Sequence, residues 1–275
     1  MKKIILALIC IFGLVGATVA APLDSFKNKQ GTINIAGGTA HIPVMREAAK
    51  RIMETNPNIK ITVTGGGSGV GVKMVGEGLA QIGNTGRPLK ANEVEQYGLQ
   101  TFPFAIDGVA VVVNPQNPVA ALSKQQLIDI FTGKITNWQQ VGGNNAAITL
   151  YNREDGSGTR ETFETLAIPG AKSVSSANIV NSNGAMKTVI SQDVNAIGYV
   201  GIGHLNNTIK GIVLDGMVPS QENAANGSYS VTRLLYMNTK GQPQGIVADF
   251  IDYIYSPDGK EIISQAGYIP VDKAK

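Results

Sequence analysis

The sequence is poor in the side chains that build disulfides and zinc sites. Of its 275 residues only Cys10 is a cysteine, and only His41 and His204 are histidines. Cys10 lies in an N-terminal segment that we expect to be removed, which excludes disulfides and thiol chemistry from the mature chain. Two histidines without a cysteine leave open only a metal site built from carboxylates. We predict no metal and no other cofactor.

Charge of one sign and long apolar runs are also scarce. The formal net charge is only +3, and charged residues make up 16% of the chain. Two of the basic residues, Lys2 and Lys3, lie in the segment expected to be removed. The remaining lysines are scattered, which argues against a nucleic-acid partner. Beyond the N-terminus no apolar run approaches the length of a membrane span, so we expect a soluble mature protein.

The N-terminus has the three parts of a secretory signal peptide, which we place at residues 1–20. Two lysines precede an apolar stretch, residues 4–15, and small residues then permit cleavage after Ala20 or Ala21. The apolar stretch is too short for a comfortable membrane span. We therefore expect the mature protein to be exported.

The mature chain alternates strand and helix patterns. Hydrophobic residues are 43% of the sequence, a globular composition, and the length allows one large domain or two smaller ones. Alternating or continuous apolar runs predict strands that begin near Gly31 or span 59–64, 81–87, 104–113, 148–152, 196–200 and 231–238. Helical spacing predicts helices at 42–55, 70–80, 123–131, 184–191 and 246–256, and residues 223–228 read as a polar loop. Such repeated units predict an α/β fold with a parallel sheet covered by helices.

Three loops between a strand and a helix share one composition of glycine and hydroxyl residues. They are residues 37–40, 65–69 and 155–159. The start of a helix has unpaired backbone N–H groups and partial positive charge, and glycine lets a ligand approach them. Such loops suit a tetrahedral anion. Ordinary helix capping by Ser and Thr explains any one of them equally well, but three together favour an anion site.

Arg153 follows the strand at 148–152 directly. A guanidinium can bind two oxygens of an anion at once, and a nearby carboxylate can hold it in place. The alternative is a surface salt bridge with Glu154, Asp155 or Glu161. The spacing slightly favours the anion-binding role.

Other motifs fail at single positions. A Walker phosphate loop would need lysine at Val72, a nucleophile elbow would need glycine at Val70, and a dinucleotide fingerprint lacks its last glycine. A secreted phosphatase or esterase using Ser68 or Ser157, with His41 as base, is an alternative. An adhesion or scaffold role is a further one, and it rests on export alone.

Seven segments carry a resemblance to a known family by their order and spacing. They are INIAGGTAHIPVM, TGGGSGVGVKMVGEGLAQIGNTGRPL, IDGVAVVVNPQNPVAALSKQQLIDIFTGKITNWQQVGG, NREDGSGTRETF, NSNGAMKTVI, AIGYVGIGHL and FIDYIYSPDGKEIISQAGYIPV. Together they span nearly the whole mature chain. The chain resembles the phosphate-binding protein of the bacterial high-affinity phosphate ABC transporter.

The resemblance implies a two-lobed periplasmic binding protein of type II, with mixed sheets flanked by helices and a ligand cleft between the lobes. Residues 30–107 and 223–275 would form the first lobe, and residues 108–222 the second. The protein would be a monomer and not an enzyme. It would capture inorganic phosphate and deliver it to the permease subunits of an ABC transporter.

The resemblance also implies a set of phosphate-binding residues, carried over position by position. They are Thr39, Ala40, Ser68, Gly86, Arg153, Asp155, Ser157, Gly158 and Thr159. In this set Asp155 would orient Arg153.

Two departures from the family pattern concern selectivity. The first loop is short of hydroxyl residues, and Gly86 stands where better-known members have a carboxylate that accepts the proton of phosphate and repels sulfate. This acceptor is either missing or supplied by Asp155 or Asp107. Arg87, next in the chain, would add a second cation or lie at the surface. Sulfate, molybdate, tungstate and arsenate are therefore alternative ligands.

Overall fold

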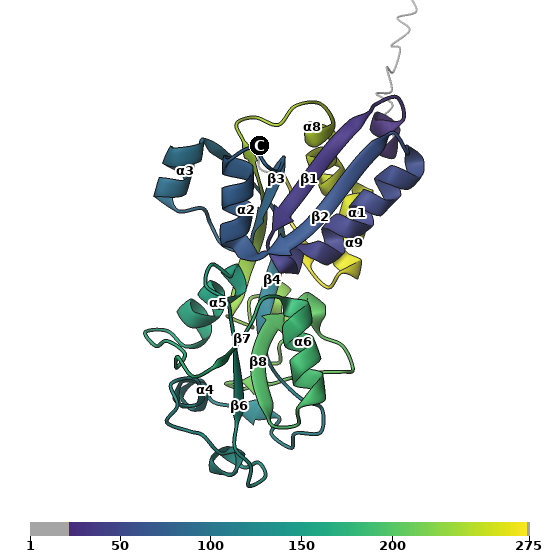
Figure 1. Ribbon diagram of the computed structural model, residues 1–275. Helices are drawn as coiled ribbons and strands as arrows, with labels where there is room; N and C mark the ends of the chain where they lie inside the picture. Colours follow the sequence, from purple (N-terminus) through teal and green to yellow (C-terminus); the bar gives the residue numbers. More distant parts are fainter. Residues whose placement is uncertain (1–21, 274–275) are drawn as a thin grey trace, which may run out of the picture.

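The protein has two lobes, which lie one above the other in Figure 1. The structure, a computed structural model, describes residues 22–273, so the predicted signal peptide lies outside the described residues. Each lobe has its own cluster of buried apolar side chains. One cluster draws on residues 26–105 and 235–268 and defines the terminal lobe. The other draws on residues 109–231 and defines the central lobe.

The terminal lobe is built around a mixed sheet. Its strands are β1 (Gly31–Gly37), β2 (Ile59–Gly66), β3 (Ile82–Thr85), β11 (Thr232–Lys240) and β12 (Ile269–Pro270). Its helices are α1 (Ile42–Thr55), α2 (Gly67–Gly76), α3 (Ala91–Tyr97), α8 (Gly245–Tyr255) and α9 (Pro257–Gln265). Strand β1 runs parallel to β2 and β3, whereas β11 is antiparallel to β3. Helix α1 buries residues at helical spacing, such as Val44, Ala48 and Ile52, against the core.

The central lobe has shorter elements. Its strands are β5 (Ala121–Leu122), β6 (Thr149–Arg153), β7 (Asn178–Val180), β8 (Ala196–Gly201), β9 (Lys210–Gly211) and β10 (Val213–Leu214). Its helices are α4 (Lys124–Phe131), α5 (Gly158–Thr162), α6 (Asn183–Gln192) and α7 (Gln221–Ala225). Strand β6 lies between β7 and β8 and runs parallel to both.

One long strand, β4 (Leu99–Val113), belongs to both lobes. Its first part pairs with β11 and β12, and its last part pairs with β8 and β9. A single sheet therefore passes through the molecule in the order β2-β1-β3-β11-β4-β8-β6-β7. The predicted α/β architecture is confirmed, but β4 joins the sheets that were expected to be separate. The parallel sheet predicted from the repeated units is wrong at the centre, where β11 and β4 pair antiparallel with their neighbours.

The segment 223–228, which the sequence placed in a polar loop, is helical at residues 223–225 and a loop only at 226–228. Helix α7 covers the first part of this segment, because the Ser220 hydroxyl accepts a hydrogen bond from the Asn223 N–H and caps it. Ala224 and Tyr229 pack in the core of the central lobe. The chain thus re-enters the terminal lobe at β11, rather than near Asn223.

Two further helices were not predicted. Helix α3 has no buried residue, so its sequence carries no apolar period. Helix α9 follows α8 directly, because Ser256 ends one helix and caps the next. None of the helices formed by residues 22–273 has the length and apolar character of a membrane-spanning helix.

Candidate functional site

A small pocket lies between the two lobes. It is lined by Gly38, Thr39, Ala40, His41, Gly67, Ser68, Gly86, Arg153, Ser157, Gly158, Thr159 and Arg233. The space open to the centre of a water-sized sphere is only about 10 Å³. The pocket therefore fits a small dehydrated ion rather than an organic substrate. All three glycine- and hydroxyl-rich loops converge on it, so the structure brings together every predicted site residue except Asp155.

Arg153 is the central cation of this pocket. It ends β6, and its side chain is 1% exposed. Its Nε and Nη2 donate to the two carboxylate oxygens of Glu154 at 2.8 Å each. Its Nη1 is buried and has no hydrogen-bond partner among the described residues. A buried charged donor without a partner is costly, so an acceptor in the pocket would stabilise it.

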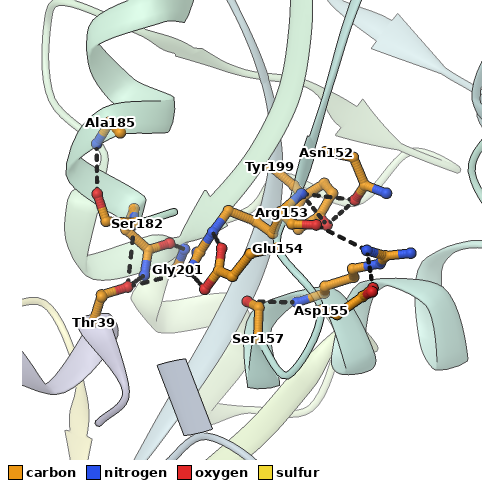
Figure 2. Close-up of polar contacts among 12 residues, drawn as sticks. Thr39, Asn152, Arg153, Glu154, Asp155, Ser157, Ser182, Ala185, Tyr199 and Gly201 are labelled. Carbon is orange, nitrogen blue, oxygen red and sulfur yellow. Dashed lines mark hydrogen bonds and ion pairs between the residues drawn. The ribbon is translucent and has the colours of Figure 1, made fainter. Parts of the chain in front are cut away.

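The predicted role of Asp155 is wrong. Its side chain is 97% exposed and pairs with Arg160 at 2.7 Å. Figure 2 shows Asp155 turned away from the side on which Arg153 meets Glu154 and Thr39. Glu154 takes the expected place because the chain after β6 directs it inward. Both carboxylates lie at this turn, and their spacing in the sequence does not show which of them holds Arg153.

Thr39 joins the two lobes through its hydroxyl oxygen. Oγ1 accepts from Nδ2 of Asn183 at 3.1 Å, from its main-chain N at 3.3 Å and from Nη2 of Arg153 at 3.5 Å. Because these contacts use the oxygen as an acceptor, the hydroxyl hydrogen is left to donate into the pocket. Asn183, at the start of α6, was not predicted as a site residue.

Glycine allows close approach of the opposite lobe. Ser68 Oγ accepts from the Gly86 N–H at 3.0 Å, within the terminal lobe. A Cβ placed on Gly158 of the central lobe would lie 2.3 Å from that Oγ. The Gly69 N–H donates across the lobes to the Gly156 carbonyl at 3.0 Å. The glycine-dense loop at 65–69 is therefore explained by a neighbouring backbone, besides any ion in the pocket.

The start of α5 supplies further polar groups. Ser157 caps this helix by accepting from the Arg160 N–H at 3.3 Å, and Ser157 and Thr159 are both buried. Gly67 and Ser68 begin α2 on the opposite wall. Unpaired N–H groups at two helix starts thus meet in one pocket, an arrangement that favours negative charge.

The sequence reasoning missed Arg233 of β11, the second cation in the pocket lining. Its Nε and Nη2 donate to Oδ2 of Asp107 at 3.0 and 2.8 Å. Arg87, which the sequence offered for this role, does not line the pocket and pairs with Glu93 and Glu161. No local signal pointed to Arg233, because its partner lies on another strand.

No carboxylate lines the pocket in the described part of the chain. Asp107 is fully buried behind Arg233, and its other oxygen accepts from the Ile202 N–H at 3.1 Å. Burial raises the pKa of the Asp107 carboxyl, while the guanidinium opposes this shift. Neither Asp107 nor Asp155 therefore replaces the acceptor that Gly86 lacks.

His41 does not form a catalytic pair with a pocket serine. No hydrogen bond joins its ring to Ser68 or Ser157 within residues 22–273. Burial, and then the nearby charge of Arg233, lower the pKa of His41 to about 3. Such a histidine stays neutral and is a weak base near neutral pH.

Comparison with known proteins places the chain in a family. A domain of the PBP superfamily matches residues 27–258. The chain is 37% identical to the phosphate-binding protein PstS of Bacillus subtilis over 96% of this chain and 89% of that protein. It is 28% identical to the PstS of Borreliella burgdorferi over 89% of this chain and 92% of that protein.

Comparison with solved structures leads to the same family. A phosphate ABC transporter substrate-binding protein from Clostridium perfringens with bound phosphate has a TM-score of 0.83 at 34% identity, covering 88% of this chain and all of that one. An ABC-type phosphate transport receptor from Vibrio cholerae has a TM-score of 0.68 at 34% identity, covering 86% and 99%. The predicted type II periplasmic-binding-protein fold is confirmed. The chain belongs to the PBP superfamily and, within it, to the PstS family of phosphate-binding proteins.

Proposed function

We propose that the protein captures inorganic phosphate in the pocket between its lobes and delivers it to the permease of an ABC transporter. The observation that carries this proposal is the buried Nη1 of Arg153, a cationic donor that has no acceptor among residues 22–273 and lies in a pocket lined by hydroxyls and helix starts. The printed functions of its PstS relatives support phosphate as the ligand and an ABC transporter as the partner.

The ligand contacts that we propose are those predicted for Thr39, Ala40, Ser68, Gly86, Arg153, Ser157, Gly158 and Thr159. Micromolar binding corresponds to about −8 kcal/mol. Several N–H and O–H donors in a nearly dry pocket supply this, and charge-assisted bonds from Arg153 contribute most.

Closure of two lobes over the ion is the proposed binding motion. We assign residues 30–107 with 232–275 to one lobe and residues 108–231 to the other, which moves the returning crossing from the predicted residue 223 to the start of β11. Thr39, Ser68 and Gly86 come from one side, and Arg153 and Gly158 from the other. A ligand that contacts both sides stabilises the closed form.

The protein acts as a binding protein and not as an enzyme, in this proposal, because the pocket excludes a phosphate ester and His41 has no serine partner. We further propose that it works as a periplasmic monomer after removal of the signal peptide near Ala20 or Ala21.

Calorimetry of the mature protein with phosphate tests the proposal. Arg153→Ala should weaken phosphate binding by about 3 kcal/mol or more, since breaking a buried ion pair costs about 3–5 kcal/mol. The control is Arg51→Ala, an arginine on α1 that pairs with Glu47 away from the pocket. Absence of phosphate binding by the wild type, or near-normal affinity of Arg153→Ala, would contradict the proposed site.

A further inference from the structure

Two guanidinium groups, rather than one, lie at the ion pocket. Arg153 reaches it from the central lobe and Arg233 from β11. The nitrogens of Arg233 that bind Asp107 are Nε and Nη2. Its Nη1 lies at Gly86, 2.8 Å from the position that a Cβ on this glycine would take. Gly86 and Arg233 both line the pocket.

Each guanidinium is held by a carboxylate that does not line the pocket. Asp107 binds Arg233 and the Ile202 N–H, and both oxygens of Glu154 bind Arg153. Only the two arginines of these pairs are among the lining residues, although Oε1 of Glu154 lies 3.0 Å from the position that a Cβ on the lining residue Gly67 would take. The resulting field favours an anion, and it acts twice as strongly on a divalent ion as on a monovalent one.

We propose that Arg233 is a specificity-determining residue, which with Arg153 makes the pocket select fully deprotonated, divalent oxyanions by charge. This inference rests on the proposed function. A protonated oxyanion carries an O–H donor, and no carboxylate of residues 22–273 lines the pocket, so only neutral acceptors such as hydroxyl oxygens remain for it. The monovalent form therefore loses charge attraction and gains only a weaker, uncharged hydrogen bond in return.

The histidines and tyrosines near the Asp107–Arg233 pair keep the same protonation state around neutral pH. Burial lowers the pKa of His41 to about 3 and that of His204 to about 4. Burial raises the pKa of the Tyr268 phenol well above its ordinary value, and that of Tyr229 in the same direction. Burial also raises the pKa of the Asp107 carboxyl, so this acid needs a separate control.

The test is calorimetry with phosphate and with sulfate from about pH 6 to about pH 8, through the second ionisation of phosphate. Wild-type affinity for total phosphate should rise with pH, by up to about tenfold per unit, while sulfate binds with constant affinity because it stays divalent. Asp107→Asn should show the same rise of phosphate affinity with pH. That result would mean that the proton is lost from phosphate and not from Asp107.

The informative variant is Asp107→Asn with Arg233→Gln, which removes both charges but keeps polar groups that can bond to each other. It should bind both anions at least about tenfold more weakly and show a flatter pH profile for phosphate. The matched control, Glu47→Gln with Arg51→Gln, removes an ion pair on α1 and should bind as the wild type. Urea unfolding without ligand checks that each variant folds.

Three outcomes decide. If the wild type binds neither anion, the proposed function and this inference both fail. If it binds phosphate but the Asp107–Arg233 double variant keeps wild-type affinity and pH profile, only the role of Arg233 is overturned. If wild-type phosphate affinity does not rise with pH, or if sulfate does not bind, selection by charge is overturned.

Discussion

The two arginine–carboxylate pairs at the pocket differ in how the chain builds them. Arg153 and Glu154 are neighbours in sequence at the end of one strand. Arg233 and Asp107 lie on adjacent antiparallel strands, directly opposite one another in the register of β11 and β4. The first pair belongs to one lobe, whereas the second lies where the chain passes between lobes. A local motif thus supplies one wall of the ion site, and the pairing of two strands supplies the other.

The two pairs also differ in their access to water. The side chain of Glu154 is 21% exposed, and that of Asp107 is fully buried. Removal of the guanidinium therefore has a different consequence for the carboxylate that remains in each pair. Glu154 could be solvated, but Asp107 would be a buried charge without its partner.

The largest expected effect is on the stability of the unliganded protein. Arg233→Met should lower the free energy of unfolding by about 3–5 kcal/mol, because it strands the buried Asp107 carboxylate. Arg153→Met should lower it by less, since water reaches Glu154. Urea denaturation without phosphate measures both. Equal losses would mean that burial does not distinguish the two pairs.

The next effect is a pH dependence on the Arg233 side of the pocket. The unfolded state binds a proton on His41 below its ordinary pKa of 6.5, but the folded state does not until about pH 3. Stability is therefore lost as pH falls below 6.5. At about 1.4 kcal/mol per unit, the loss attributable to His41 between pH 6.5 and about pH 5 is about 2 kcal/mol. In urea unfolding, His41→Gln should remove this part of the pH dependence of stability, while the part that comes from His204 should remain. If the pH dependence is the same in wild type and variant, the proton taken up on unfolding does not bind to His41.

A smaller effect is expected where the two walls meet. Gly158→Ala puts a Cβ 2.3 Å from Ser68 Oγ and 3.1 Å from the Gly86 carbonyl carbon, atoms of the opposite lobe. The lobes cannot then approach as closely, so phosphate affinity should fall at least about tenfold, or about 1.4 kcal/mol.

The control is Gly184→Ala on α6, where only Ser182 Oγ, at 3.9 Å, is near the added Cβ. Calorimetry and unliganded stability should be measured together. A large loss of stability in Gly158→Ala would show that this contact acts within a lobe rather than between lobes.

The smallest expected effect is on phosphate affinity at Asp155, where the sequence-based prediction and the structure disagree. Asp155→Asn should change phosphate affinity by less than about 0.5 kcal/mol, because this exposed carboxylate pairs with Arg160 at the surface. A tenfold loss, measured by calorimetry, would restore the predicted role of Asp155 in orienting Arg153.

Local patterns predicted much of the fold. Apolar periods located β1, α1, β2, β4 and β11, because these elements bury one face or both in a core. Exposed or short elements such as α3 and β7 escaped, since they carry no apolar period. The strand β4 was predicted as buried, but its passage through both lobes was not, because pairing partners far along the chain decide where a strand lies.

At the site, the sequence alone is enough to find the donors: three glycine- and hydroxyl-rich helix starts and Arg153. These groups are specified locally, because glycine content and helix capping act within a few residues. The folded structure was needed to show that Glu154 holds Arg153, that Arg233 joins it, and that no carboxylate of residues 22–273 lines the pocket. Charge pairing and burial depend on groups that sheet register and lobe packing bring together from distant parts of the chain, and no local pattern encodes such pairings.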